Sequence, residues 1–376
     1  MKLTLASTFI GVATVLSPVV DADNTPNLCT VDITDLVKIK PSDASGLVPP
    51  NITVGGFEYN GDAEHFVVGS ASSRHNRRVL VYLPGTTDRP ELSSCLIKSV
   101  ADALPYPTIG LSYAYLSSGD KFRNGKCALV GTLADQVECL SEQHNDAIDG
   151  GTYGNTHFKD GTPFWDPVEP ANSITARLGY LLKHLDETIP NSGWDKLYTD
   201  DTSFPKPVWG KIVVMGHSQG AGHAAYLGQT KLIKGAIMVS GPQDECTGCP
   251  ETKFWIDEPY ISKRYTAFAS ADEPLVGVMK DNWNRMIAAG ATTWQTDHVI
   301  DVGFGVDTSS LKETVCKGPI LTSVIPASTS TCGGKEHCST AIDDSVPFIE
   351  KGNGDKQYLY DINVWPSIAK YNKKCK

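Results

Sequence analysis

The amino-acid sequence predicts an α/β fold in which a mostly parallel central sheet is flanked by helices. Three observations lead to this prediction. Strand-like and helix-like segments alternate along most of the chain. Several of the strand-like segments are continuous apolar runs, as expected for strands covered on both faces. Of the 376 residues, 40% are hydrophobic, which is enough to form a sizeable core.

The first strand–helix–strand unit follows two shorter strand-like stretches, ITVGGFEYN and HFVVGSAS. It starts with RRVLVYLPG, residues 77–85, whose apolar run Val79–Leu83 suits a buried strand. Residues 91–104 carry apolar side chains at helical spacing, and residues 108–116 are again strand-like. A unit of this kind predicts two parallel strands.

The alternation resumes after residue 171. A helix is expected in NSITARLGYLLKHLDETIP, with Asn172 or Ser173 as its cap and Pro190 as its end. KIVVM then suits a buried strand, and AGHAAYLGQ a helix of small residues. GAIMVSGP and RYTAFAS are expected to be strands, VGVMKDNWNRMIAAG a helix and HVIDVGF a last strand. This pattern predicts one open sheet.

Residues 117–171 interrupt this rhythm. A short segment around 133–140 has helical character, but the rest is rich in Gly, Asp, Asn and Pro. A connection of this length inside one domain is usually functional, so we expect a loop-rich insertion that serves as a lid or lines a site. We therefore expect a single domain over residues 23–376.

The N-terminus has the pattern of a secretory signal peptide. Lys2 precedes an uncharged apolar run, and small residues lie near Ala22, so residues 1–22 are expected to be removed on secretion. An uncleaved membrane anchor is the alternative. All 10 cysteines follow this segment, which suggests disulfides in an extracellular protein, with Cys127–Cys139 and Cys332–Cys338 as local pairings. The tripeptide Asn51-Ile52-Thr53 is a glycosylation sequon, so we expect a glycoprotein.

The formal net charge is −10. An acidic protein repels phosphate backbones and anionic lipids, so we expect no nucleic-acid partner. We also expect no stable insertion into a membrane, because the only long apolar run is short for a span, and we expect a monomer.

The segment IVVMGHSQGAGHAAYLG places Ser218 between Gly216 and Gly220. A G-x-S-x-G pattern is typical of a catalytic serine on a strained turn when a buried strand precedes it and a helix follows it. Both are expected here. Residues two before and two after the serine would clash if they were bulky. A second late-strand serine, Ser112, lacks the following glycine and small-residue helix, so we interpret it as structural.

With this motif the chain resembles secreted serine esterases and lipases of the α/β-hydrolase superfamily, from about Val79 to the region of His337. The resemblance implies an α/β-hydrolase fold and the triad order serine, acid, histidine. Asp272, directly after RYTAFAS, is then the preferred acid. Glu273 is its close competitor and Asp244 a weaker one. Capping of the next helix is the alternative role for Asp272 and Glu273.

Only two histidines follow the acid. His337 lies in a glycine-rich loop flanked by Cys332 and Cys338, and is the preferred base; His298 lies in a strand-like segment and is the alternative. His217 precedes the serine on its strand, so its side chain is expected to point away, and His223 is expected to pack on the following helix.

An oxyanion hole needs two backbone N–H groups. The residue after the nucleophile, Gln219, supplies one. By similarity to the family, the other belongs to Thr86 or Thr87 in the turn PGTT.

The function expected from these residues is hydrolysis of carboxylic esters by a secreted Ser-His-Asp enzyme of esterase, lipase or cutinase type, which needs no metal or cofactor. The substrate would be a small-molecule or polymeric ester. A serine peptidase on the same fold and a catalytically inactive secreted binding protein are the alternatives.

Overall fold

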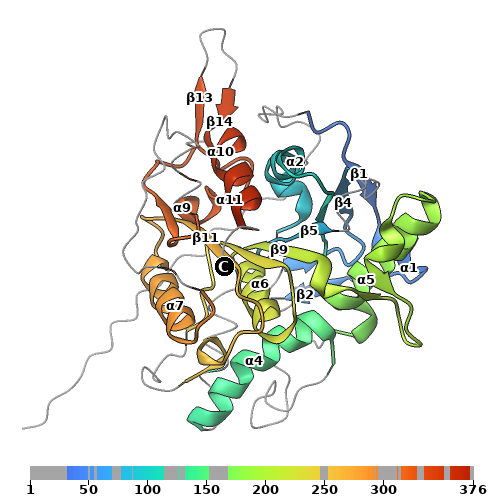
Figure 1. The fold of residues 1–376 in the computed structure, drawn as a ribbon, viewed down its shortest axis with the longest axis horizontal. Helices are drawn as coiled ribbons and strands as arrows, with labels where there is room; N and C mark the ends of the chain where they lie inside the picture. Colours follow the sequence, from blue (N-terminus) through green and yellow to red (C-terminus); the bar gives the residue numbers. More distant parts are fainter. Residues whose placement is uncertain are drawn as a thin grey trace, which may run out of the picture.

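The structure, a computed structural model, describes residues 32–49, 51–54, 57–69, 78–86, 88–113, 127, 132–151, 168–245, 253–292, 294, 311, 315–327, 334–350 and 356–372. Helices surround one central sheet in this part of the chain (Figure 1).

Within the described residues, the central sheet has eight strands in the order β1-β4-β6-β5-β9-β10-β11-β12. Only β4 runs against the others, because it pairs antiparallel with both β1 and β6 while every other pairing is parallel. The predicted α/β class with a mostly parallel sheet is confirmed. The strands are β1 Val37–Ile39, β4 His65–Val68, β5 Val79–Leu83, β6 Thr108–Gly110, β9 Ile212–His217, β10 Gly235–Val239, β11 Tyr265–Ser270 and β12 Ile320–Thr322.

The helices of the described residues connect and cover these strands. They are α1 Pro41–Ser45, α2 Ser94–Ala103, α4 Leu133–Asp149, α5 Ile174–Thr188, α6 Gln219–Thr230, α7 Val276–Ala288, α9 Lys335–Cys338, α10 Leu359–Ile362 and α11 Val364–Asn372. In the part of the chain that the structure describes, three two-stranded pairs lie outside the main sheet: β2 Ile52–Val54 with β3 Phe57–Tyr59, β7 Tyr198–Thr199 with β8 Lys206–Pro207, and β13 Phe348–Glu350 with β14 Lys356–Tyr358.

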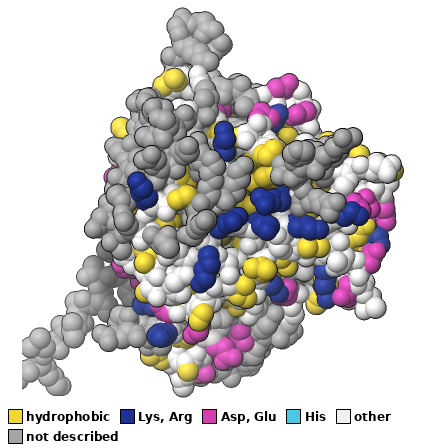
Figure 2. Space-filling model, viewed as in Figure 1, with side chains coloured by type: hydrophobic (Ala, Val, Ile, Leu, Met, Phe, Trp, Pro, Cys, Tyr) yellow, Lys and Arg dark blue, Asp and Glu magenta, His cyan; other side chains and the backbone are white. Residues whose placement is uncertain are grey.

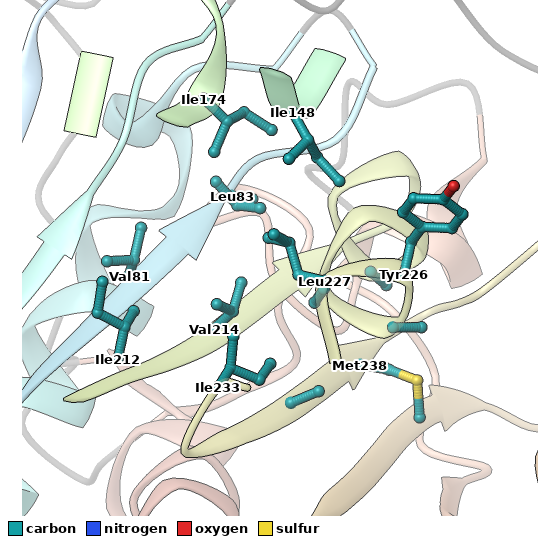
Figure 3. Close-up of a cluster of buried hydrophobic side chains, with 14 of the residues drawn as sticks. Val81, Leu83, Ile148, Ile174, Ile212, Val214, Tyr226, Leu227, Ile233 and Met238 are labelled. Carbon is teal, nitrogen blue, oxygen red and sulfur yellow. The ribbon is translucent and has the colours of Figure 1, made fainter. Parts of the chain in front are cut away.

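The core has two layers, one on each face of the sheet. Alternate residues of a strand point to opposite faces. In β5, Val79, Val81 and Leu83 accordingly belong to one apolar cluster, and Leu80 and Tyr82 to the other. The first cluster packs against α4, α5 and α6, and Figure 3 shows part of it; the second packs against α2 and α11. Burial on both faces explains why the central strands read as continuous apolar runs.

Most predicted elements are present with small shifts of their ends. Val79–Leu83 is β5, and Ser173 caps α5 by accepting the N–H of Ala176 (3.2 Å). The strand expected over residues 108–116 ends at Gly110, and the helix expected near 133–140 continues to Asp149. The two edge strands of the described sheet, β1 and β12, are not among the strands that the sequence predicts.

The predicted disulfide Cys127–Cys139 is present and joins α4 to the segment before it. Cys338 is also disulfide-bonded, but Cys332 lies outside the described residues, so that pairing stays a prediction. Residues 1–22, most of the insertion outside α4, Thr87 and the segment with His298 also lie outside them. Within the described ranges, no helix has the length and apolar character needed to cross a membrane.

Candidate active site

Ser218 lies at the sharp turn between β9 and α6, in the middle of the sheet. Its backbone angles, φ 54° and ψ −118°, fall in a region that residues with a side chain rarely adopt. The Ser218 N–H donates to the Val239 carbonyl (2.9 Å), and the Ser218 carbonyl accepts the N–H of Ala221 (3.0 Å). The turn is therefore held from the neighbouring strand and from the first turn of the helix.

The glycines that flank this serine are required by close approach of the backbone. A Cβ atom on Gly216 would lie 2.0 Å from the Gly220 carbonyl oxygen. A Cβ atom on Gly220 would lie 2.1 Å from the Leu83 carbonyl oxygen, on the next strand. Both distances are far below van der Waals contact, so only glycine fits. The expectation that larger residues clash at these two positions is confirmed.

The turn after β5 lies directly against the serine. A Cβ atom on Gly85 would lie 3.0 Å from Ser218 Cβ, which shows how closely this turn approaches the serine. Thr86 Oγ1 donates to Gln219 Oε1 (3.0 Å), which joins the turn to the first residue of α6. Two of the three predicted oxyanion residues, Thr86 and Gln219, are thus brought together. The amino end of α6 adds a positive electrostatic field at this place.

His337, the predicted base, lies in the short helix α9 and pairs with a carboxylate from the loop after β11. His337 Nδ1 is 2.5 Å from Glu273 Oε1. The Glu273 side chain is only 1% exposed, whereas that of His337 is 22% exposed. A histidine held at Nδ1 by a buried carboxylate is oriented to transfer protons at Nε2.

The structure does not place Asp272, the preferred acid, against His337. The Asp272 side chain is exposed, and its backbone N–H donates to Ser270 Oγ (3.3 Å). The next residue, Glu273, turns inward instead. The preference for Asp272 is therefore corrected: the residues share one turn, and only the second faces α9. Neither acid caps α7, whose N-cap is Leu275 without a side-chain bond.

Asp244, the weaker alternative for the acid, belongs to a separate buried cluster. Its Oδ1 lies 3.3 Å from His144 Nε2, and His144 Nδ1 lies 2.9 Å from His223 Nδ1. All three side chains are almost fully buried. His223 therefore packs on α6, as expected, and Asp244 faces away from His337. Ser112 is likewise buried, with its N–H donated to His65 Nδ1 (3.0 Å), which agrees with a structural role.

Gln243 is a residue of this site that sequence reasoning missed. Its Nε2 donates to Glu273 Oε1 (2.8 Å) and lies 3.2 Å from His337 Nδ1. It follows β10 closely, at the same edge of the sheet as Ser218 and Glu273. That position, shortly after a strand next to the serine strand, is the signal that would have identified it.

His217 contacts α9, although it was expected to point away from the site. Its Nε2 donates to the His337 backbone carbonyl (3.1 Å), and the centroids of the His217 and His337 rings are 4.7 Å apart. On its other side, Nδ1 lies 3.4 Å from Asp88 Oδ2. The expectation was wrong because α9 covers the side of the strand to which His217 points, so that this side chain lies next to the site. His217 thus connects the turn after β5 with the backbone of the histidine.

No hydrogen bond joins the Ser218 hydroxyl to the His337 ring in the described part of the structure. Glu273 occupies Nδ1, so the contact expected for catalysis is one between Ser218 Oγ and His337 Nε2. In enzymes without substrate this contact is often long and shortens on binding.

The pKa of Glu273 predicts an acid-sensitive contribution to stability. Burial opposes ionisation, but the charge and hydrogen bond of His337 outweigh it and hold the pKa below the usual 4.5. A carboxylate with a lowered folded-state pKa stabilises the protein above its unfolded-state pKa, and loses that effect as the pH falls through the folded-state value.

We therefore expect the free energy of unfolding to fall more steeply for the wild type than for Glu273→Gln as the pH drops below about 5. Urea unfolding followed by circular dichroism at a series of pH values measures this difference. Parallel curves for the two proteins would contradict it.

The chain has similarities to known proteins only at the level of its fold. No protein-family model matches it, and no curated protein matches it. Among solved structures it is similar to a dienelactone hydrolase from Anabaena variabilis ATCC 29413, with 10% identity over 76% of this chain and 86% of the other and a TM-score of 0.32.

It is also similar to EstE1, a carboxylesterase cloned from a metagenomic library, with 10% identity over 69% and 76% of the two chains and a TM-score of 0.34. For the Pyrococcus furiosus esterase Pf2001 the identity is 12%, the coverage 80% and 90%, and the TM-score 0.33. These similarities concern the arrangement of the fold.

Proposed function

We propose that the protein is a serine hydrolase that cleaves carboxylic esters, with Ser218 as nucleophile, His337 as general base and Glu273 as the acid that orients the base. The observation that carries the proposal is the strained backbone of Ser218 at the end of β9. A backbone in this region costs about 1–3 kcal/mol and is found where function requires it. Buried Glu273 follows β11 on the same edge of the sheet, and its carboxylate contacts Nδ1 of the partly exposed His337.

In the proposed mechanism, His337 Nε2 accepts the proton of Ser218 Oγ as the oxygen attacks the ester carbonyl. Glu273 stabilises the imidazolium that forms, because its carboxylate is ionised and bonded to Nδ1. The Gln219 N–H and an N–H of the turn at Thr86 or Thr87 hold the oxyanion. The protonated His337 then protonates the alcohol that leaves, and water releases the acid from the acyl-enzyme.

Secretion remains part of the proposal. The Cys127–Cys139 disulfide supports it, because disulfides form and persist in oxidising compartments. The proposed substrate is a small-molecule or polymeric ester. The two alternatives differ in substrate turnover: a serine peptidase on the same fold would cleave peptides, and an inactive binding protein would cleave neither peptides nor esters.

Labelling with a fluorophosphonate probe tests the nucleophile without knowledge of the natural ester. We expect the wild type to be labelled and to hydrolyse p-nitrophenyl esters, and Ser218→Ala to lose both activities. The loss of turnover should be roughly 10⁴-fold or more, because the serine forms the covalent bond.

Ser112→Ala is the matched control, since Ser112 is also a serine after a strand of the same sheet, and it should keep both activities. An unlabelled wild type, or a label that persists in Ser218→Ala, would refute the proposal. Labelling together with peptide cleavage but no ester turnover would identify a peptidase.

A further inference from the structure

The amino ends of the central strands carry a row of basic residues. One stands directly before each of four neighbouring strands, β5, β9, β10 and β11: Arg78, Lys211, Lys234 and Arg264. The amino ends of parallel strands meet at one edge of a sheet, and the register pairs Val79 with Ile212, so that the first two basic residues are neighbours. The row crosses three strand spacings, about 14 Å.

The positive charge of this row is not neutralised by nearby acids. Within the described ranges, none of the four side chains forms a salt bridge with an aspartate or a glutamate. All four are partly exposed. The whole chain has a net charge of −10, so these four basic residues form a local group of the opposite sign. Such a distribution orients the protein in the field of an anionic surface.

Two exposed aliphatic side chains lie beside the row. Leu232 is 65% exposed and Ile261 is 52% exposed. Their loops are joined, because Ser262 Oγ accepts the N–H of Ile233 (3.0 Å) and lies 3.1 Å from the Lys231 carbonyl. Leu232 stands two residues before Lys234, and Ile261 three before Arg264. We call the four basic residues with Leu232 and Ile261 the amino-edge patch.

Figure 2 shows one face of the molecule with side chains coloured by type. Lysine and arginine side chains gather near the middle of this face, close to where Figure 1 places β5 and β9. Hydrophobic side chains lie between and beside them.

We propose that the amino-edge patch docks the protein on an anionic lipid surface. Exposed aliphatic side chains enter the boundary between headgroups and acyl chains, while lysine and arginine bind the anionic headgroups. Docking of this kind is peripheral and needs no membrane-crossing helix. The expectation that the acidic chain repels anionic lipids is based on its net charge, whereas this edge has the opposite local charge.

The position of the patch decides how a docked molecule is oriented. Ser218 and Glu273 follow the carboxyl ends of β9 and β11, whereas the patch precedes the amino ends. The two edges are separated by the length of a strand of five or six residues, about 17–20 Å. If the proposed hydrolase function holds, the docked enzyme opens esters on the side away from the lipid, and the docking lipid is not its substrate. The docking itself does not depend on that function.

Co-sedimentation with vesicles tests the docking. We expect the wild type to bind vesicles of phosphatidylcholine with phosphatidylserine but not vesicles of phosphatidylcholine alone, and to be released by added salt. Lys211→Gln/Lys234→Gln and Leu232→Ser/Ile261→Ser should each weaken binding roughly ten-fold or more. Ser218→Ala should bind as the wild type does, so loss of catalysis and loss of docking are separate results.

Matched controls make the same chemical changes elsewhere. Lys40 and Lys280 are exposed and form no salt bridge with a described residue, and Val48 and Ile325 are 79% and 83% exposed. Lys40→Gln/Lys280→Gln and Val48→Ser/Ile325→Ser should bind like the wild type. Circular dichroism and turnover of p-nitrophenyl esters show whether each variant is folded. If a double variant does not fold, Lys234→Gln alone should weaken binding about three-fold.

Three results would overturn the proposal. One is a wild type that does not bind the anionic vesicles, and another is equal loss of binding in the patch and control variants. The third is retention on polygalacturonate without binding to vesicles, which would identify an acidic polysaccharide as the partner.

Discussion

Glu273→Gln is expected to lower kcat for ester hydrolysis roughly 10⁴-fold, the size of effect found when the acid of a serine triad loses its charge. The amide retains the size of the carboxylate but removes the negative charge from His337 Nδ1. The imidazolium that forms during attack by Ser218 then loses the carboxylate that stabilises its charge. The amide can also present its NH₂ group to Nδ1, which would hold the wrong tautomer of the ring.

Asp272→Asn is the matched control, because it removes the same charge one residue earlier. Asp272 is exposed and makes no side-chain contact with His337, so kcat should change less than about three-fold. Stopped or continuous assays with a p-nitrophenyl ester measure both variants, with circular dichroism as the check of folding. The reverse order of effects would restore Asp272 as the acid.

Gly216→Ala is expected to destabilise the protein by at least about 4 kcal/mol or to prevent folding, which is at the upper end of the effects of single substitutions. The added Cβ atom would lie 2.0 Å from the Gly220 carbonyl oxygen. Neither partner moves easily, because β9 is paired with β5 and β10 and Gly220 itself lies against Leu83. The clash is between two backbone segments and not with a flexible side chain.

Gly277→Ala makes the same change in α7, where a Cβ atom meets nothing within 4 Å. This variant should be neutral or more stable by up to about 1 kcal/mol, because alanine favours a helix. Urea unfolding followed by circular dichroism compares both with the wild type. Similar free energies of unfolding for the two variants would contradict this prediction, because they would mean that the turn at Gly216–Gly220 accommodates a Cβ atom.

The sequence predicts those residues of the site whose positions depend on a short pattern of neighbouring residues. Ser218 and its two glycines follow from five adjacent residues between a buried strand and a helix. His337 was preferred because it lies in a glycine-rich loop beside cysteines, and the structure places it in α9 next to Glu273. The choice between Asp272 and Glu273 was beyond the sequence, because both follow the same strand. Asp272 and Glu273 are adjacent in one turn, and the path of the backbone there buries Glu273 and exposes Asp272.

The sequence alone determined the class of the fold and the position of the strained serine. Both depend on short-range features: apolar runs that must be covered on two faces, and glycines where backbone segments approach closely. The order of the strands, the inward turn of Glu273 and the contacts of Gln243 and His217 were decided by the tertiary structure. Each of these joins segments far apart in the chain, and their distances are set by how the helices pack on the sheet.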